Sequence, residues 1–189
     1  MTWERASEIV LAAVLVAAAM TELRRGKIYN WLTYPAIIVG LGLGAAAGVA
    51  EGAAWDGLRD HLFGFGAGFG VLFAAYIIGG MGGGDVKLMG AVGAFLGWPG
   101  ALHATLYSFL VAAAMGLILM IWRGQTWSVL RRLGVAIRLL PLPGVKMDEA
   151  VPASSLEVPF GLAACIGTLW HVAEHELGGS LVDLVGNLF

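Results

Sequence analysis

The sequence predicts an all-α fold, a polytopic membrane bundle of about six transmembrane helices. Of its 189 residues, 59% are hydrophobic and only 13% are charged, and the mean hydropathy is +0.82. A soluble domain carries about 25% charged residues, so this chain is depleted in charge about twofold. Long apolar runs recur along the whole length, and we expect residues 1–189 to form one integral-membrane domain in the lipid bilayer.

The apolar runs define six expected spans. They cover residues 9–21, 32–50, 62–81, 88–98, 101–122 and 158–172. A span needs about 20 apolar residues to cross the hydrocarbon core, so the fourth is short. The tripeptide "WPG" at Trp98–Gly100 is expected to turn the chain between the fourth and fifth spans.

The loops between the spans differ in charge. Residues 22–30 and 123–157 contain most of the lysines and arginines, whereas residues 51–61 contain one arginine among three acids. Basic loops stay on the cytoplasmic side, which predicts an inner-membrane protein with both termini outside. Within the long basic loop, the segment "TWSVLRRLGVAIRLL" is typical of an amphipathic helix lying on the cytoplasmic membrane surface.

Asp85 is an acid in an otherwise glycine-rich and apolar segment, "GGMGGGDVKLMGAVGAFLG". A charged acid inside a membrane costs about 2.5–3.5 kcal/mol, so it faces a partner or water. The glycines before it end the third span and allow another backbone to come close. Asp85 is then expected near the N-terminus of the fourth helix, where simple capping is the ordinary explanation.

Glu22 is the second acid that needs an explanation. It follows an apolar run and precedes Arg24 and Arg25, so the ordinary explanation is an ion pair with a neighbouring base. The expected topology, however, puts Glu22 and Asp85 at the same cytoplasmic level. Two carboxylates about 4 Å apart repel by roughly 4 kcal/mol at an effective dielectric of about 20, so only one ionises easily. Such a pair activates a water in aspartic proteases and titrates as a unit.

Other chemistries lack their residues. The single cysteine, Cys165, excludes an internal disulfide and a CxxC zinc site. Of the four histidines, only His171 and His175 have a metal-ligand spacing, and a polar helix end is the more ordinary explanation for that pair. We therefore expect no metal and no organic cofactor. The net charge of −2 gives no reason to expect a nucleic-acid partner.

Three segments resemble motifs of the type IV prepilin peptidases. Gly82, Gly84 and Asp85 match the GxGD motif, with Lys87 and a leucine following in register. "ELRRGKIYNWLT", residues 22–33, resembles the family's first acidic motif, and "VPFGLA", residues 158–163, resembles the start of its last helix. The chain is similar to the short forms without the N-terminal methyltransferase region, as in tight-adherence or archaeal preflagellin peptidases.

The resemblance implies a membrane aspartyl endopeptidase that cleaves the basic leader from a membrane-inserted prepilin on the cytoplasmic side. It gives the catalytic roles to Asp85 and Glu22, with Gly82, Gly84 and Lys87 as supporting motif residues. Arg24, Arg25, Lys27 and Lys87 oppose the approach of a basic leader, so the scissile region rather than the leader charges is expected to enter the site.

Two positions depart from the family pattern. Glu22 stands where the family has aspartate, and Tyr29 stands where proline is usual. The extra methylene adds about 1.5 Å of reach, and a misplacement of about 1 Å costs about 100-fold in rate. A catalytically weak or inactive prepilin-binding relative is therefore one alternative. A small proton- or cation-coupled transporter is another, although the sequence lacks the internal repeat with paired broken helices typical of transporters.

Overall fold

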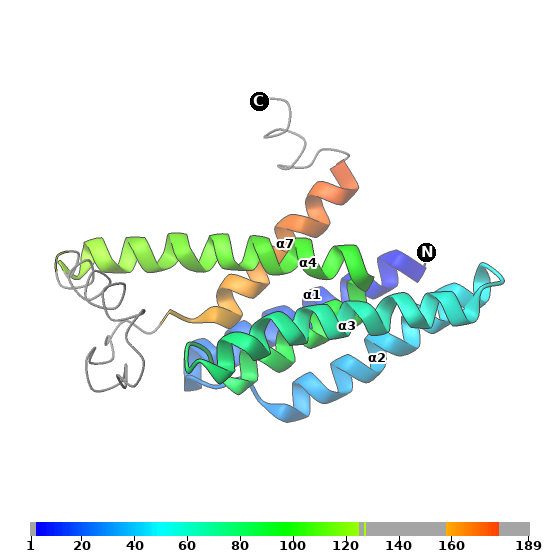
Figure 1. Cartoon of the computed structure of the whole chain (residues 1–189). Coiled ribbons are helices and arrows are strands. Elements are labelled where there is room, and N and C mark those ends of the chain that lie inside the picture. Colours follow the sequence, from blue (N-terminus) through cyan, green and yellow to red (C-terminus); the bar gives the residue numbers. More distant parts are fainter. Residues whose placement is uncertain (1–2, 125–126, 128–157, 178–189) are drawn as a thin grey trace, which may run out of the picture. The chain divides into compact units, whose positions relative to one another are not determined.

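The computed structural model describes residues 3–124, 127 and 158–177, and these residues form helices and no strand (Figure 1). The helices are α1 (Trp3–Arg25), α2 (Asn30–Ala50), α3 (Ala54–Ile77), α4 (Gly83–Trp122) and α7 (Phe160–Leu177). The predicted all-α class is therefore confirmed. Within the described part of the chain, α1 to α4 are long and apolar enough to cross a membrane. The protein is thus a multi-pass membrane protein, and the number of six spans stays a prediction.

Two of the predicted loops are shorter than expected. Helix α1 continues to Arg25, so Glu22 is helical and the loop covers only residues 26–29. Helix α3 begins at Ala54, which leaves residues 51–53 as the second loop. Hydropathy misses both helix ends because a helix that leaves the membrane carries polar residues without losing its backbone hydrogen bonds. An acid in the first turn of α3, Asp56, also favours the helix start there.

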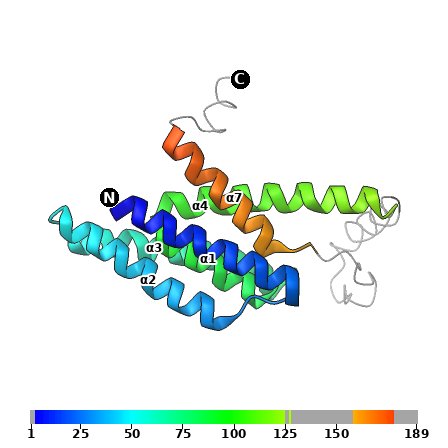
Figure 2. The same ribbon diagram turned by 180° about the vertical axis from the view of Figure 1, so that it is seen from behind.

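Helix α4 consists of two helical segments joined at Gly97, which has φ 72° and ψ −175°. A positive φ favours glycine, and a Cβ at this position would collide with Asp60. Pro99, two residues later, has no N–H to continue the helix. The expected turn at "WPG" is confirmed, and the chain reverses its direction there (Figures 1 and 2).

Two side chains of α3 bind the backbone groups that the bend releases. In an unbroken helix, the Trp98 N–H would donate to the Ala94 carbonyl. Instead, Trp98 N–H donates to Asp60 Oδ2 at 3.4 Å, and the Ala94 oxygen lies 2.8 Å from His61 Nδ1. A carbonyl oxygen only accepts, so this ring nitrogen carries the proton. Both groups keep a partner, which matters because an unpaired backbone group is costly inside a membrane.

A third side chain, Ser7 of α1, also binds a backbone group at this bend. The Phe95 carbonyl would accept a hydrogen bond from residue 99, but that residue is proline. Ser7 Oγ donates to the Phe95 oxygen at 3.5 Å. The bend in α4 is thus held from both α1 and α3.

The helices approach one another closely at glycines. A Cβ at Gly64 would collide with the Gly93 carbonyl, and a Cβ at Gly68 with that of Met89. These two glycines belong to "GFGAGFG", so they serve the close packing of α3 on α4. Helix α1 packs on α2 and α7, and α2 packs on α3. In both views, α7 begins beside α1 and diverges from it towards its own C-terminal end (Figures 1 and 2).

The chain divides into two compact units. The first comprises Met1–Val111 with Pro159–Phe189, and the second comprises Ala112–Val158. All the candidate site residues belong to the first unit, whereas the described part of the second contains mainly the end of α4. The single domain over residues 1–189 stays a prediction. The predicted amphipathic helix lies outside the described residues, apart from Trp127.

Candidate active site

Asp85 lies in the first turn of α4, half-buried, as the glycine break predicted. The Gly82 N–H donates to Asp85 Oδ2 at 3.2 Å, and the Asp85 N–H donates back to the Gly82 carbonyl at 3.1 Å. An acid at the third helical position that reaches back to the N-cap N–H is one half of a capping box. Asp85 therefore caps α4, and this same contact fixes where its carboxyl group lies.

Glu22 lies in the last turns of α1 and contacts the first turn of α7. The Leu162 N–H donates to Glu22 Oε2 at 3.1 Å. The first N–H groups of a helix have no partner within the helix and favour a negative charge. Gly161 makes the approach possible, because a Cβ there would lie 2.9 Å from Glu22 Oε2. Glu22 is thus held by α7, whereas Arg25 donates to the Tyr29 hydroxyl at 3.2 Å.

Ile28, in the short loop after α1, connects the two acid positions. A Cβ at Gly84 would lie 3.1 Å from Ile28 Cβ, and a Cβ at Gly161 would lie 3.0 Å from Ile28 Cδ1. The isoleucine therefore lies between the start of α4 and the start of α7. The three motif segments of the sequence meet at one place.

Lys87 ties the start of α4 to the start of α2. Its Nζ donates to Asn30 Oδ1 at 2.8 Å and lies 5.3 Å from the centroid of the Tyr34 ring. Tyr29, just before α2, has φ −88° and ψ 140°. This is close to the polyproline conformation, so tyrosine keeps the backbone shape that a proline would have there.

The sequence reasoning did not single out Ile28, Asn30 or Leu162. Ile28 and Asn30 lie inside the first motif segment, residues 22–33, and Leu162 lies inside the third, residues 158–163. Membership of these segments was the only feature of the sequence that could have pointed to them. Leu162 acts through its backbone N–H, a group that almost every residue has. Only the position of α7 against α1 gives that N–H its role.

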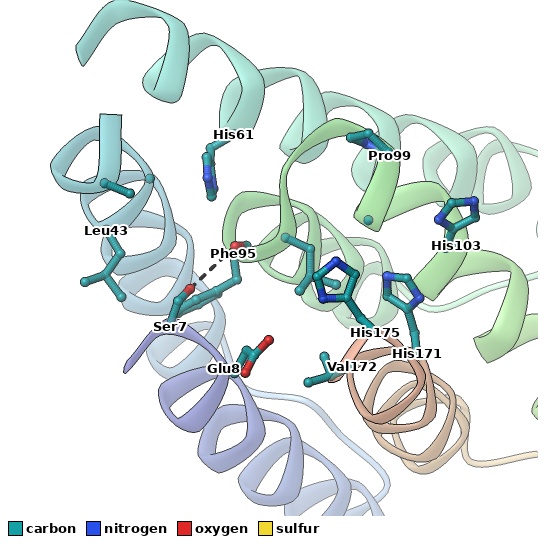
Figure 3. Close-up of a pocket in the computed structure, with 14 residues that line it drawn as sticks. Ser7, Glu8, Leu43, His61, Phe95, Pro99, His103, His171, Val172 and His175 are labelled. Atoms are coloured by element: carbon teal, nitrogen blue, oxygen red, sulfur yellow. Dashed lines mark hydrogen bonds between the residues drawn. The ribbon is translucent and has the colours of Figure 1, made fainter. Parts of the chain in front are cut away.

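A cavity of about 470 Å³ lies at the other end of α1, beside Ser7 and Glu8. All four histidines of the sequence line it (Figure 3). Neither Glu22 nor Asp85 lines it. Within the residues that the structure describes, no three His, Cys, Asp or Glu side chains are arranged around a common metal position.

Comparison with known proteins identifies the family of the chain. The model of the type IV leader peptidase family matches residues 9–117, a range that includes both acids and ends before α7. The prepilin leader peptidase/N-methyltransferase of Aeromonas hydrophila is 34% identical over 133 residues, which cover 67% of this chain and 44% of that protein. The protein of the same name from Myxococcus xanthus (strain DK1622) is 27% identical over 131 residues, with 66% and 37% covered.

The chain thus spans less than half the length of these curated relatives. No solved structure matches it. The family model covers more than half of the 189 residues and includes the segments that carry Glu22 and Asp85. The chain belongs to the type IV leader peptidase family.

Proposed function

We propose that this protein is a membrane aspartyl endopeptidase that removes the leader from prepilin-like substrates. The observation that carries the proposal is that Ile28 lies against both Gly84, the neighbour of Asp85, and Gly161, which Glu22 approaches. The family membership and the printed names of the relatives support the substrate class. The protease activity of those relatives belongs to longer proteins, so for this chain it is a proposal.

In the proposed reaction, the two acids share one proton. The charged carboxylate takes a proton from a water molecule, whose oxygen attacks the scissile carbonyl carbon. The protonated partner gives its proton to the leaving amine nitrogen as the C–N bond breaks. The N–H groups of Gly82 and Leu162 orient the carboxyl groups for this exchange. Titration belongs to the pair, because each charge raises the cost of the other.

We propose that the acid end of the bundle faces the cytoplasm, with the protein in the inner membrane. Arg24, Arg25 and Lys27 follow Glu22, and Lys87 follows Asp85, so basic residues gather at this end. Lys87 and Arg25 also contact Asn30 and Tyr29. Both partners are uncharged, so the positive charges remain, and the scissile region rather than the basic leader enters the site.

The test is cleavage by the purified full-length chain in detergent, with a prepilin from the same cell as substrate. The wild type is expected to shorten the prepilin, and Asp85→Asn to abolish cleavage while still binding, because an amide cannot exchange the proton. Asp56→Asn, an exposed acid on α3 outside the acid pair, serves as the matched control and is expected to cleave normally. Cleavage by a folded Asp85→Asn variant would refute the aspartyl mechanism. Binding without cleavage by the wild type would identify an inactive relative instead.

A further inference from the structure

The short loop between α1 and α2 begins on the backbone of Glu22. The Gly26 N–H donates to the Glu22 carbonyl at 2.7 Å, and Gly26 has φ 64°. Glycine adopts this left-handed conformation without strain at the end of a helix. The loop ends at Asn30, the first residue of α2. One acid is thus joined by a short stretch of chain to the start of α2.

The far end of this loop is attached to the segment that carries Asp85. Lys87, two positions after Asp85 in α4, donates from its Nζ to Asn30 Oδ1 at 2.8 Å, the length of a strong charged hydrogen bond. The same Nζ lies 5.3 Å from the centroid of the Tyr34 ring, one turn further along α2. Both partners of the lysine belong to α2, so its side chain is directed towards that helix.

These contacts close a ring of chain between the two acids. From the first acid the chain runs to Asn30, crosses the hydrogen bond to Lys87 and returns to Asp85. Ile28 lies within the ring, with its Cβ 3.1 Å from the place of a Cβ at Gly84. Reacting groups keep their geometry only where packing and hydrogen bonds around them hold it. Loss of the contact between the lysine and the asparagine would release the end of the loop.

We propose that Lys87 and Asn30 are positioning residues that set the separation of the two acids. The inference rests on the proposed protease function, for which that separation matters. Lys87 acts through its contacts on α2 and does not bind the substrate, since its ammonium group points to Asn30 and Tyr34. Lys27, in the loop itself, is exposed. The two lysines at this end of the bundle thus have different roles.

The first test is the kinetics of prepilin cleavage by the full-length chain in detergent. Lys87→Met removes the ammonium group and is expected to lower kcat by about 10- to 100-fold, with KM changed by less than about threefold. Asn30→Leu is expected to lower kcat equally, and the double variant no further, because both changes remove one contact. Asn30→Asp keeps an acceptor and is expected to recover most of the rate. Lys27→Met, which removes a charge at the same end, is the matched control and is expected to cleave normally.

A second test reports the geometry without any cleavage. In a Cys165→Ser background, Ile28→Cys is combined with Gly84→Cys, whose Cβ positions lie 3.1 Å apart, near the separation of about 3.5–4.5 Å in disulfides. Mild oxidation is expected to join this pair, followed as the loss of thiols that react with a maleimide. Adding Lys87→Met is expected to slow the reaction by about tenfold, and adding Lys27→Met to leave it unchanged.

The two tests separate this inference from the proposed function. If the wild type cleaves no prepilin, the protease function fails, and the rate of disulfide formation alone decides whether the contact positions the loop. An equal rate with and without Lys87→Met would overturn the inference. A raised KM at unchanged kcat in Lys87→Met would do the same, because the lysine would then bind the substrate. Folding is checked by the unfolding midpoint, and should Lys87→Met fail to fold, Asn30→Leu and Asn30→Asp replace it in both tests.

Discussion

Glu22 differs from the aspartate of the family pattern by one methylene, and the structure shows how that methylene is used. The longer side chain reaches from α1 to the Leu162 N–H, at 3.1 Å. The missing side chain of Gly161 leaves space for the carboxyl group. An aspartate on the same backbone would end about 1.5 Å short of this donor. We infer that the site is adapted to glutamate.

This adaptation gives the first prediction, which rests on the proposed protease activity. Glu22→Asp is expected to lower the turnover rate by about 10- to 100-fold, because the shorter carboxyl loses its fixed position. Glu22→Gln is expected to be inactive, since it leaves no second acid to hold the proton. Prepilin cleavage and binding are measured for both variants beside the wild type. If Glu22→Asp were faster than the wild type, the site would not be adapted to glutamate.

Ile28 gives a second prediction at the same scale. Its side chain lies between Gly84 and Gly161, so Ile28→Ala allows the two acid positions to shift. We expect turnover to fall by about tenfold or more while prepilin binding changes little. The matched control is Ile38→Ala, which removes the same atoms from a side chain that is 71% exposed. Equal losses in both variants would indicate general destabilisation rather than positioning of the acids.

Among the helices, α4 is the element with the least regular backbone. Its bend is held by Asp60 and His61 from α3 and by Ser7 from α1. The segment of α4 that carries Asp85 therefore ends at a bend whose backbone groups are hydrogen-bonded to neighbouring helices.

The bend leads to a prediction about stability. His61→Ala leaves the Ala94 carbonyl without its donor and is expected to lower the free energy of unfolding by about 1–3 kcal/mol. His61→Asn is expected to recover most of this loss, because its amide N–H can donate in the same place. Arg59→Ala, an exposed neighbour on α3, is the control. The unfolding midpoint of each purified variant in detergent is the measurement, and a normal midpoint for His61→Ala would argue against this role.

At the scale of the whole molecule, the two ends of the first unit differ in chemistry. Glu22 and Asp85 lie at one end, with Lys27 in the loop between α1 and α2. The histidine-lined cavity lies at the other end, near the acidic start of α3 at Asp56. A membrane protein oriented by its basic loops would hold these ends in different compartments.

That arrangement is tested by labelling in intact cells. In a Cys165→Ser background, Asp56→Cys is expected to react with an impermeant thiol reagent from outside, and Lys27→Cys only after lysis. Cys165, the free cysteine of the chain, is buried, so its replacement removes little background signal. Reaction of Lys27→Cys in intact cells, with Asp56→Cys protected, would reverse the proposed orientation and place the acids outside.

The sequence predicts some of the local structure around the candidate site, but not the contacts between its helices. Asp85 at a helix start follows from the glycines before it, and the turn at Gly97 follows from the neighbouring proline. The helical state of Glu22 was missed because polar residues at the end of a membrane helix resemble a loop. The donor from Leu162 had no signal at all, since it is a backbone group whose role depends on packing between distant helices.

The contact between Glu22 and Leu162 also has a consequence for how the protein is made. The two residues are 140 positions apart in the chain. At a synthesis rate of about 5–20 residues per second, Leu162 leaves the ribosome roughly 7–28 s after Glu22. Asp85 follows Glu22 by 63 positions, so in the later part of that interval the growing chain contains both acids but not the helix that holds one of them. If the proposed peptidase needs that contact for turnover, the growing chain stays inactive in the membrane until the first turn of α7 has been made.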